Sequence, residues 1–306
     1  AFDGAWSFLC YFGDVFSMRR LFPFLCLLMI SSARAVIVSG GDGSGNLTGT
    51  GVSGWDYVGS VNGASGVYLG DYNGSYWVLT AGHVGAGNFT LNGTTYSLVD
   101  GSAVSLTDGE GGAVDLTLFR IATDPGLSTL ALSDSTPMAG TSVTMIGYGL
   151  NRGTTVTRWD ADWNESQFGI YRGYKWTGTS AKRWGKNTVV GSATNGTTEY
   201  FTTTFLSTNG SAQATVGDSG GGVFITVNGT VELAGSMGLV SSFSGQPGST
   251  SVYGNQTYNA DISVYRSQIL SIVSAVPEPG VSILGLGGLL VILAGGMIKI
   301  RRAGLR

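Results

Sequence analysis

Three side chains with the chemistry of nucleophilic hydrolysis occur in separate motifs of this chain: His83, Asp115 and Ser219. His83 is the single histidine and follows Thr-Ala-Gly, Asp115 stands near the start of an apolar run, and Ser219 lies in Gly-Asp-Ser-Gly-Gly. An imidazole near neutral pH takes a proton from a hydroxyl, a carboxylate orients the imidazole, and the activated hydroxyl attacks a carbonyl carbon. The three residues predict acyl transfer if folding brings them together.

The segment around Ser219 is a tight, glycine-rich turn that leads into an apolar strand. Glycine adopts positive φ angles and lets the backbone approach a ligand closely, so such a turn holds a serine exposed with free N–H groups beside it. Those are the requirements of an activated hydroxyl and an oxyanion cradle.

Each of the other two residues also has a plainer interpretation. A lone histidine is more often structural or simply exposed, and Asp115 is alternatively a strand-edge carboxylate that faces water. A carboxylate buried without a partner is costly, which favours a compensated, functional Asp115. Asp108, Glu110 and Asp124 are weaker candidates because each lies in a turn-like or Pro/Gly-flanked context.

Taken together, the motifs resemble those of the trypsin/chymotrypsin-like serine proteases over roughly residues 36–275. The resemblance implies an all-β fold of two six-stranded antiparallel β-barrels with a C-terminal helix. It implies that His83 is the general base, that Asp115 orients it and that Ser219 is the nucleophile of an endopeptidase. The backbone N–H groups of Gly217 and Ser219 would form the oxyanion hole.

The same resemblance assigns supporting roles to four further positions. In this family a freed amino terminus pairs with the residue matching Asp218, and residues 36–38 look like the start of the active enzymes, with Ser39 interrupting the motif. Gln213 matches the floor of the specificity pocket, and Gly238 lies in the strand that lines it. No carboxylate lies between residues 207 and 217, which argues against strict cleavage after Lys or Arg.

The elements that must position these residues are short apolar runs separated by Gly, Asn and Asp, the pattern of an antiparallel barrel or sandwich. Asn228-Gly229 predicts a two-residue hairpin. A closing amphipathic helix is predicted over residues 261–273, with one face formed by Ile262, Tyr265, Ile269 and Val273.

We expect the two barrels to divide near residues 124–139. Residues 151–186 are expected to form a long loop and hairpin beside the active site; the alternative, suggested by their interleaved aromatic and basic residues, is a polymer-binding surface.

Composition excludes several classes of function. Charged residues make up 11% of the chain, against roughly 25% in an average protein, and the 51 glycines fit an exported, turn-rich β protein. A net charge of −3 gives no basic footprint for nucleic acid. Cys10 and Cys26 both precede Ala35, after which we predict that a signal peptide is cleaved. The mature chain would then have no thiol nucleophile and no thiolate metal site. We expect no metal or cofactor; calcium held by loop oxygens stays open.

Both ends of the chain read as targeting segments. We expect residues 1–17 to be a non-native or mis-started leader, and residues 18–35 match a signal peptide cleaved after Ala35, with a transmembrane helix as the alternative. Residues 276–306 contain Pro-Glu-Pro, an uncharged stretch at 281–298 long enough to span a bilayer, and a basic end. The alternative for that stretch is a buried core helix.

The C-terminal segment resembles the PEP-CTERM sorting signal of Gram-negative bacteria, which an exosortase is thought to process. This predicts export to the periplasmic side of the inner membrane and then the outer surface or extracellular matrix. The expected partners are a polypeptide substrate, the membrane and an exosortase, with no nucleic acid. A catalytically silent surface or biofilm-matrix binding protein is the alternative function, and an esterase with the same triad is a third.

Overall fold

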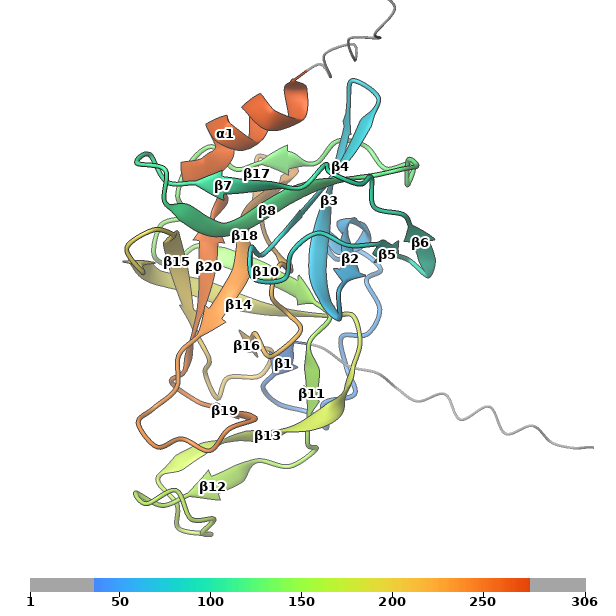
Figure 1. Ribbon diagram of the computed structural model, residues 1–306. Helices are drawn as coiled ribbons and strands as arrows, with labels where there is room; N and C mark the ends of the chain where they lie inside the picture. Colours follow the sequence, from blue (N-terminus) through green and yellow to red (C-terminus); the bar gives the residue numbers. More distant parts are fainter. Residues whose placement is uncertain (1–35, 276–306) are drawn as a thin grey trace, which may run out of the picture. The chain divides into compact units, whose positions relative to one another are not determined.

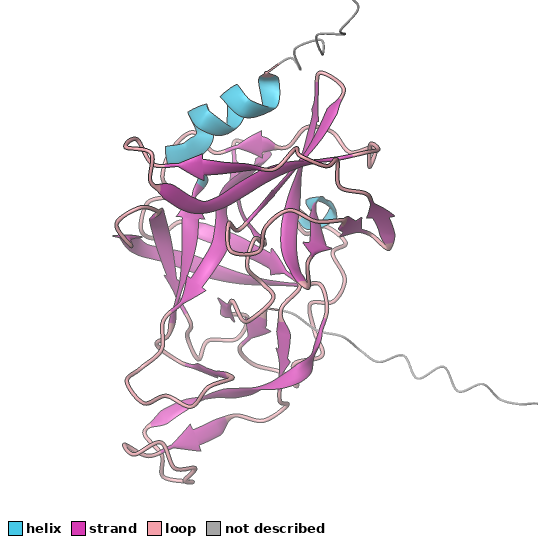
Figure 2. Ribbon diagram, viewed as in Figure 1, coloured by secondary structure: helices cyan, strands magenta, loops and turns pink. Residues whose placement is uncertain are grey.

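The computed structural model describes residues 36–275, which are mostly β-strand with one α-helix at the end (Figures 1 and 2). The segments predicted to be a leader, a signal peptide and a sorting signal with a helix at 281–298 lie outside the described residues. Within residues 36–275, no helix is long and apolar enough to cross a membrane.

Seven strands form the first sheet, in the order β6-β5-β2-β3-β4-β8-β7. Their bounds are β2 Val58–Val61, β3 Ala64–Tyr72, β4 Ser75–Thr80, β5 Phe89–Leu91, β6 Thr94–Tyr96, β7 Val104–Thr107 and β8 Ala113–Ile121, preceded by a 3-10 turn at Trp55–Tyr57. Strands β4 and β8 pair antiparallel with Thr80 opposite Thr117. The end of β4 therefore lies beside the start of β8.

The second sheet contains β17, β10, β14, β15, β20, β18 and β9 in that order. Their bounds are β9 Ala131–Leu132, β10 Ser142–Gly147, β14 Arg183–Thr194, β15 Glu199–Thr204, β17 Gly222–Val227, β18 Thr230–Val240 and β20 Gln256–Asp261. An additional pairing between β17 and β18 closes the first six of these strands into a barrel.

The expectation of two six-stranded barrels is therefore wrong for the first sheet. Its terminal strands, β6 and β7, are only 3 and 4 residues long, and no pairing within the described chain joins them. The domain is a trypsin-like fold with one barrel and one half-barrel. The chain passes from one sheet to the other between β8 and β10, where the short β9 runs parallel to β18.

Two small sheets complete the structure. Strand β13 (Tyr171–Ser180) pairs with β11 (Leu150–Arg152), β12 (Thr157–Trp159) and β19 (Thr250–Val252), and β1 (Ile37–Val38) pairs with β16 (Ala212–Gln213). The hairpin predicted within residues 151–186 is confirmed by the antiparallel pairing of β12 with β13, and the structure adds that β13 also pairs with β11 and β19. This four-stranded sheet extends away from α1 (Figure 1).

Helix α1 (Ile262–Ser274) closes the domain as predicted. The Asp261 carboxylate accepts a hydrogen bond from the N–H of Ser263 and caps the helix, and the buried face consists of the four residues expected there. The Asn228-Gly229 hairpin is also confirmed, with positive φ angles at both residues. One hydrophobic core joins residues of both sheets and the helix, including Leu79, Leu116, Ile146, Phe224 and Tyr265. This shared core fixes the two sheets against each other.

Candidate active site

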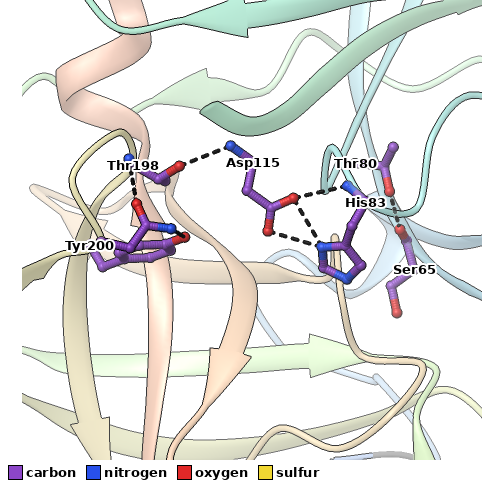
Figure 3. Close-up of polar contacts among 7 residues, drawn as sticks. Ser65, Thr80, His83, Asp115, Thr198 and Tyr200 are labelled. Carbon is purple, nitrogen blue, oxygen red and sulfur yellow. Dashed lines mark hydrogen bonds and ion pairs between the residues drawn. The ribbon is translucent and has the colours of Figure 1, made fainter. Parts of the chain in front are cut away.

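The imidazole of His83 faces the carboxylate of Asp115 (Figure 3). His83 Nδ1 lies 2.9 Å from Asp115 Oδ1 and 3.0 Å from Oδ2, and the backbone N–H of His83 donates to Oδ1 at 2.9 Å. A carboxylate partner makes Nδ1 the donor, which leaves Nε2 free to accept a proton. The His83 side chain is 49% exposed and that of Asp115 17%, so the imidazole reaches solvent while the carboxylate is largely covered.

The paired strands β4 and β8 explain why these two residues meet. His83 follows β4 by three residues, and Asp115 is the third residue of β8. Gly82 makes the turn compatible with this approach, because a Cβ there would lie 3.2 Å from both Cα and Oδ1 of Asp115. Asp115 is also held from the second sheet: its N–H donates to the hydroxyl of the buried Thr198 at 2.9 Å (Figure 3).

The loop that carries Ser219 is bound to the first sheet by Ser65. The Ser65 N–H donates to the Ser219 carbonyl at 3.0 Å, and the Ser65 hydroxyl donates to the Gly217 carbonyl at 2.8 Å. The Ser65 carbonyl accepts in turn from the hydroxyl of Thr80 at 2.7 Å. Because Thr80 is the last residue of β4, the loop that carries Ser219, which we call the nucleophile loop after its predicted role, lies against the strand end that leads to His83.

Among residues 36–275, the Ser219 hydroxyl makes no hydrogen bond to a protein group. The residue is half-buried. Catalytic hydrogen bonds are often long or poorly aligned without substrate and tighten in the Michaelis complex, so this geometry is compatible with a nucleophile at rest.

The N–H groups around Ser219 follow an informative pattern. Those of Asp218, Gly220 and Gly221 donate to backbone carbonyls at 3.0, 2.8 and 2.8 Å. Those of Gly217 and Ser219 donate to no acceptor in the described part of the chain. Gly217 has a φ of +94°, a conformation that favours glycine. The two free donors are the pair that the family resemblance predicts for an oxyanion hole.

Asp218 points away from solvent and anchors the loop. Its carboxylate accepts from the N–H of Gly149 at 2.7 Å, from the N–H of Thr215 at 2.8 Å and from the Thr215 hydroxyl at 3.1 Å. The backbone N–H of the buried Val36 is a further donor. Burial raises the pKa of Asp218 to about 6, against the opposing effect of these donors.

The two predicted specificity residues lie in different surroundings. A Cβ on Gly238 would be 3.3 Å from Asp115 Oδ2 and 3.4 Å from Tyr200 Cε1, so this part of β18 lies at the candidate catalytic pair. Gln213 is buried in β16 opposite Ile37, and its Oε1 has no hydrogen-bond partner among the described residues. The assignment of both residues to a specificity pocket remains a prediction.

The sequence did not indicate Ser65, which binds the loop that carries Ser219, or Thr198, which binds the backbone N–H of Asp115. Neither belongs to a motif: Ser65 follows the Asn62-Gly63 turn, and Thr198 follows the Asn195-Gly196 turn. The turns were readable from sequence, but the partners of these hydroxyls lie 152 and 83 residues away.

Within the described residues, no group of three or more His, Cys, Asp or Glu side chains is gathered as a metal site. The expectation that the protein needs no metal or cofactor is not tested by this finding and stays a prediction.

Comparison with known proteins defines the class. The family model of the trypsin-like peptidase domain matches residues 64–231, more than half of the chain, and the chain belongs to this family. A protease-type hydrolase is the activity that the family supports.

Two solved structures of Rv3671c from M. tuberculosis are similar to the chain. An inactive serine-to-alanine mutant of the H37Rv protein is 14% identical, with a TM-score of 0.46, and the match covers 79% of this chain and 99% of that one. The inactive form of the Rv3671c protease is 15% identical, with a TM-score of 0.45 and coverage of 78% and 100%. None of the curated proteins compared with the chain matches it.

Proposed function

We propose that the protein is an exported serine endopeptidase that hydrolyses peptide bonds with His83, Asp115 and Ser219. The observation that carries this proposal is the double hydrogen bond from His83 to Asp115 at a strand end that also contacts the Ser219 loop. Membership of the trypsin-like peptidase family supports the reaction class.

The proposed reaction begins with attack of Ser219 Oγ on the scissile carbonyl carbon. His83 Nε2 takes the hydroxyl proton and later delivers it to the leaving amine, which gives an acyl-enzyme that water then hydrolyses. Asp115 keeps the proton of the neutral imidazole on Nδ1 and stabilises the imidazolium that forms. No cofactor takes part in this scheme.

Charge that develops on the carbonyl oxygen is stabilised by the N–H groups of Gly217 and Ser219. Both donors are free before substrate binds, so no protein hydrogen bond must break to engage the oxyanion. Loss of one such donor typically costs about 3 to 4 kcal/mol of transition-state stabilisation.

Signal cleavage after Ala35 would activate the enzyme by freeing the amino group of Val36. Two observations support this step: the N–H of Val36 already donates to the Asp218 carboxylate, and Val36 has a φ of +38°, a strained angle for a β-branched residue. Cleavage removes the peptide bond that defines this angle and leaves an ammonium group beside the carboxylate.

Export and anchoring complete the proposal. Residues 18–35 direct the chain across the inner membrane, residues 281–298 anchor it on the periplasmic side, and an exosortase processes the PEP-CTERM segment to release it towards the outer surface. The substrate is a polypeptide. The amino-terminal residue of purified protein, determined by mass spectrometry, tests the cut: any residue other than Val36 contradicts it.

Active-site labelling with a fluorophosphonate tests the enzyme proposal directly. Wild-type protein should label and Ser219→Ala should not. Absence of label on folded wild-type protein would favour the catalytically silent matrix-binding alternative, and equal labelling of both proteins would place the nucleophile elsewhere. Parallel ester and peptide assays distinguish a protease from an esterase.

His83→Ala separates a catalytic from a structural role for the imidazole. Because the side chain is half-exposed, this variant should lose hydrolysis while its thermal unfolding stays almost unchanged. A comparable loss of folded protein would instead assign the histidine a structural role.

A further inference from the structure

The four-stranded sheet built around β13 carries a cluster of aromatic rings that the catalytic scheme does not use. The rings of Trp163 and Tyr171 are stacked, with centroids 4.2 Å apart and planes 12° apart. Phe243 completes the cluster at 5.4 Å from Tyr171 and 6.3 Å from Trp163. Trp163 and Tyr171 are half-buried and Phe243 is exposed, so the cluster reaches solvent.

The buried Trp159 and the loop after β18 hold the cluster in place. The buried Trp159 ring lies 6.4 Å from that of Trp163, and Trp163 Nε1 donates to the Ser244 carbonyl at 2.8 Å. A Cβ on Gly245 would be 3.1 Å from the Trp163 ring, so the loop after β18 packs directly on the cluster. Such fixed rings lose little conformational freedom when a ligand binds.

Two large apolar side chains in the segment between Trp163 and β13 are exposed, Phe168 by 84% and Ile170 by 70%. They flank Gly169, where an added Cβ would lie 2.5 Å from the backbone of Trp159, and Ile170 directly precedes Tyr171. Together with Trp163, Tyr171 and Phe243 they form what we call the aromatic surface. Exposed apolar residues gathered in one place on a soluble protein mark an interaction site.

An open strand edge leads from the candidate active site towards this surface. Strand β18 pairs with β17 as far as Ser236, and Met237 exchanges backbone hydrogen bonds with Gly220 and Gly221 of the Ser219 loop. From Gly238 to Val240 the one strand neighbour of β18 in the described chain is β20. Gly238 in this stretch lies at Asp115. Leu239 and Val240 follow, both exposed, and Phe243 comes three residues later.

We propose that the aromatic surface binds an apolar segment of the polypeptide substrate at a distance from the scissile bond. An extended chain that adds to the open edge of β18 gains backbone hydrogen bonds and advances about 3.3 Å per residue. A substrate that leaves the site past Gly238 therefore reaches Phe243 within a few residues. This inference rests on the proposed peptidase function and names the substrate class: polypeptides with exposed apolar stretches, such as unfolded chains.

A neighbouring cavity of ≈ 560 Å³ extends the same binding site. It is lined by Trp159, Trp163 and Trp176 together with the loop at 247–250 and the ion-paired Lys175 and Glu165. Its aromatic and polar lining suits an aromatic side chain with a hydrogen-bonding end.

Matched peptide substrates test the inference. All share one cleavable core and carry a ten-residue extension, either apolar and aromatic or built of Gly and Ser, before or after the scissile bond. For one of the two sides, the peptide with the apolar extension should have a KM roughly tenfold lower than the peptide with the Gly/Ser extension, because burial of one or two apolar side chains is worth about that factor. Only one side should show this difference, because the open edge leaves the site in one direction. kcat should change little.

The variant Phe168→Ser/Ile170→Ser should remove this preference and leave turnover of the unextended core unchanged. Val264→Ser on α1 is the matched control, because it also replaces an exposed apolar residue and should keep the preference. Ser219→Ala protein provides a readout independent of turnover: it should bind the apolar peptide by fluorescence titration, and the double substitution in that background should weaken binding.

Equal KM values for all extensions, or an equal loss on extended and unextended substrates in the double variant, would overturn the inference. So would preferential binding of a soluble polysaccharide, or self-association that the double substitution abolishes. If wild-type protein fails to hydrolyse any peptide but Ser219→Ala protein still binds the apolar peptide through Phe168 and Ile170, the peptidase proposal fails and the binding surface stands.

Discussion

Gly220 lies so close to Thr80 that a Cβ on the glycine would be 2.3 Å from the threonine hydroxyl oxygen. The same Cβ would be 2.3 Å from the backbone carbonyl oxygen of Ser65. Glycine at this position is therefore what lets the nucleophile loop of the second sheet sit against the strand that leads to His83.

Gly220→Ala should accordingly cost more than the backbone strain alone. Gly220 and Gly229 have φ angles of +81° and +82°, but Gly229 faces open space. Gly229→Ala should lower the free energy of unfolding by about 1 kcal/mol, whereas Gly220→Ala should lower it further and reduce kcat. Urea denaturation and peptide hydrolysis of the two variants measure the difference. Equal effects would show that the contact with Thr80 is easily relaxed.

Asp115→Asn should leave the fold intact and lower kcat by roughly 10⁴-fold, the loss that an amide causes at this position of a triad. The reason is that an amide can donate to Nδ1 and so place the imidazole proton on Nε2, where a free acceptor is needed. Asp124→Asn is the control. The Asp124 carboxylate accepts hydrogen bonds from the Tyr68 hydroxyl and the N–H of Gly126, and neither bond involves His83. A similar loss in both variants would remove Asp115 from the mechanism.

Asp218 should make the stability of the uncleaved chain depend on pH. Its pKa is raised from 3.8 to about 6, so the folded protein holds the proton more tightly than the unfolded chain. The free energy of unfolding should therefore fall as pH rises from about 4 to 6, by an amount on the order of 3 kcal/mol.

Cleavage before Val36 should reduce that fall, because an ammonium group favours the ionised carboxylate. Urea denaturation at several pH values, on protein that begins at Val36 and on the uncleaved chain, measures this change. Asp218→Asn in the uncleaved chain should flatten the profile. Identical profiles for cleaved and uncleaved protein would argue against the pairing of Val36 with Asp218.

Lys182 is a buried cation that the active site does not use. Its Nζ lies 4.5 Å from the centroid of the Trp55 ring and makes no hydrogen bond within residues 36–275, and burial lowers its pKa to about 8. Because the unfolded chain binds this proton more tightly, stability should rise between pH 8 and 10.

Lys182→Met should remove that rise and stabilise the protein by about 2 kcal/mol at pH 7, since it ends the burial of a charge. The exposed Lys186→Met is the control and should change neither quantity. Thermal or urea unfolding across this pH range gives both values, and a loss of stability in Lys182→Met would mean that the contact with Trp55 outweighs desolvation.

Local sequence was sufficient where one short segment determines the structure. The Asn228-Gly229 turn, the apolar face of α1 and the strands before His83 and after Asp115 all follow from patterns a few residues long. The resemblance to trypsin-like proteases then placed these elements in one domain.

What could not be predicted depends on contacts between distant segments. Whether the first sheet closes is decided by the pairing of β6 and β7, and the sheet around β13 depends on β19, whose Ser251 carbonyl packs on Gly173. The residues around Gly173 in the sequence do not indicate that β19 is the strand that pairs there. The same is true of Thr198, whose hydroxyl accepts from an amide in the other sheet.

Strand order also determines when the protein can become active. The proton acceptor and its carboxylate belong to the first half of the polypeptide, whereas the attacking alcohol enters with a barrel whose closure requires β18 and β20. Under the proposed mechanism, a chain that is only partly synthesised therefore lacks a complete set of the three groups, and the order of synthesis alone protects its own emerging segments from premature cutting.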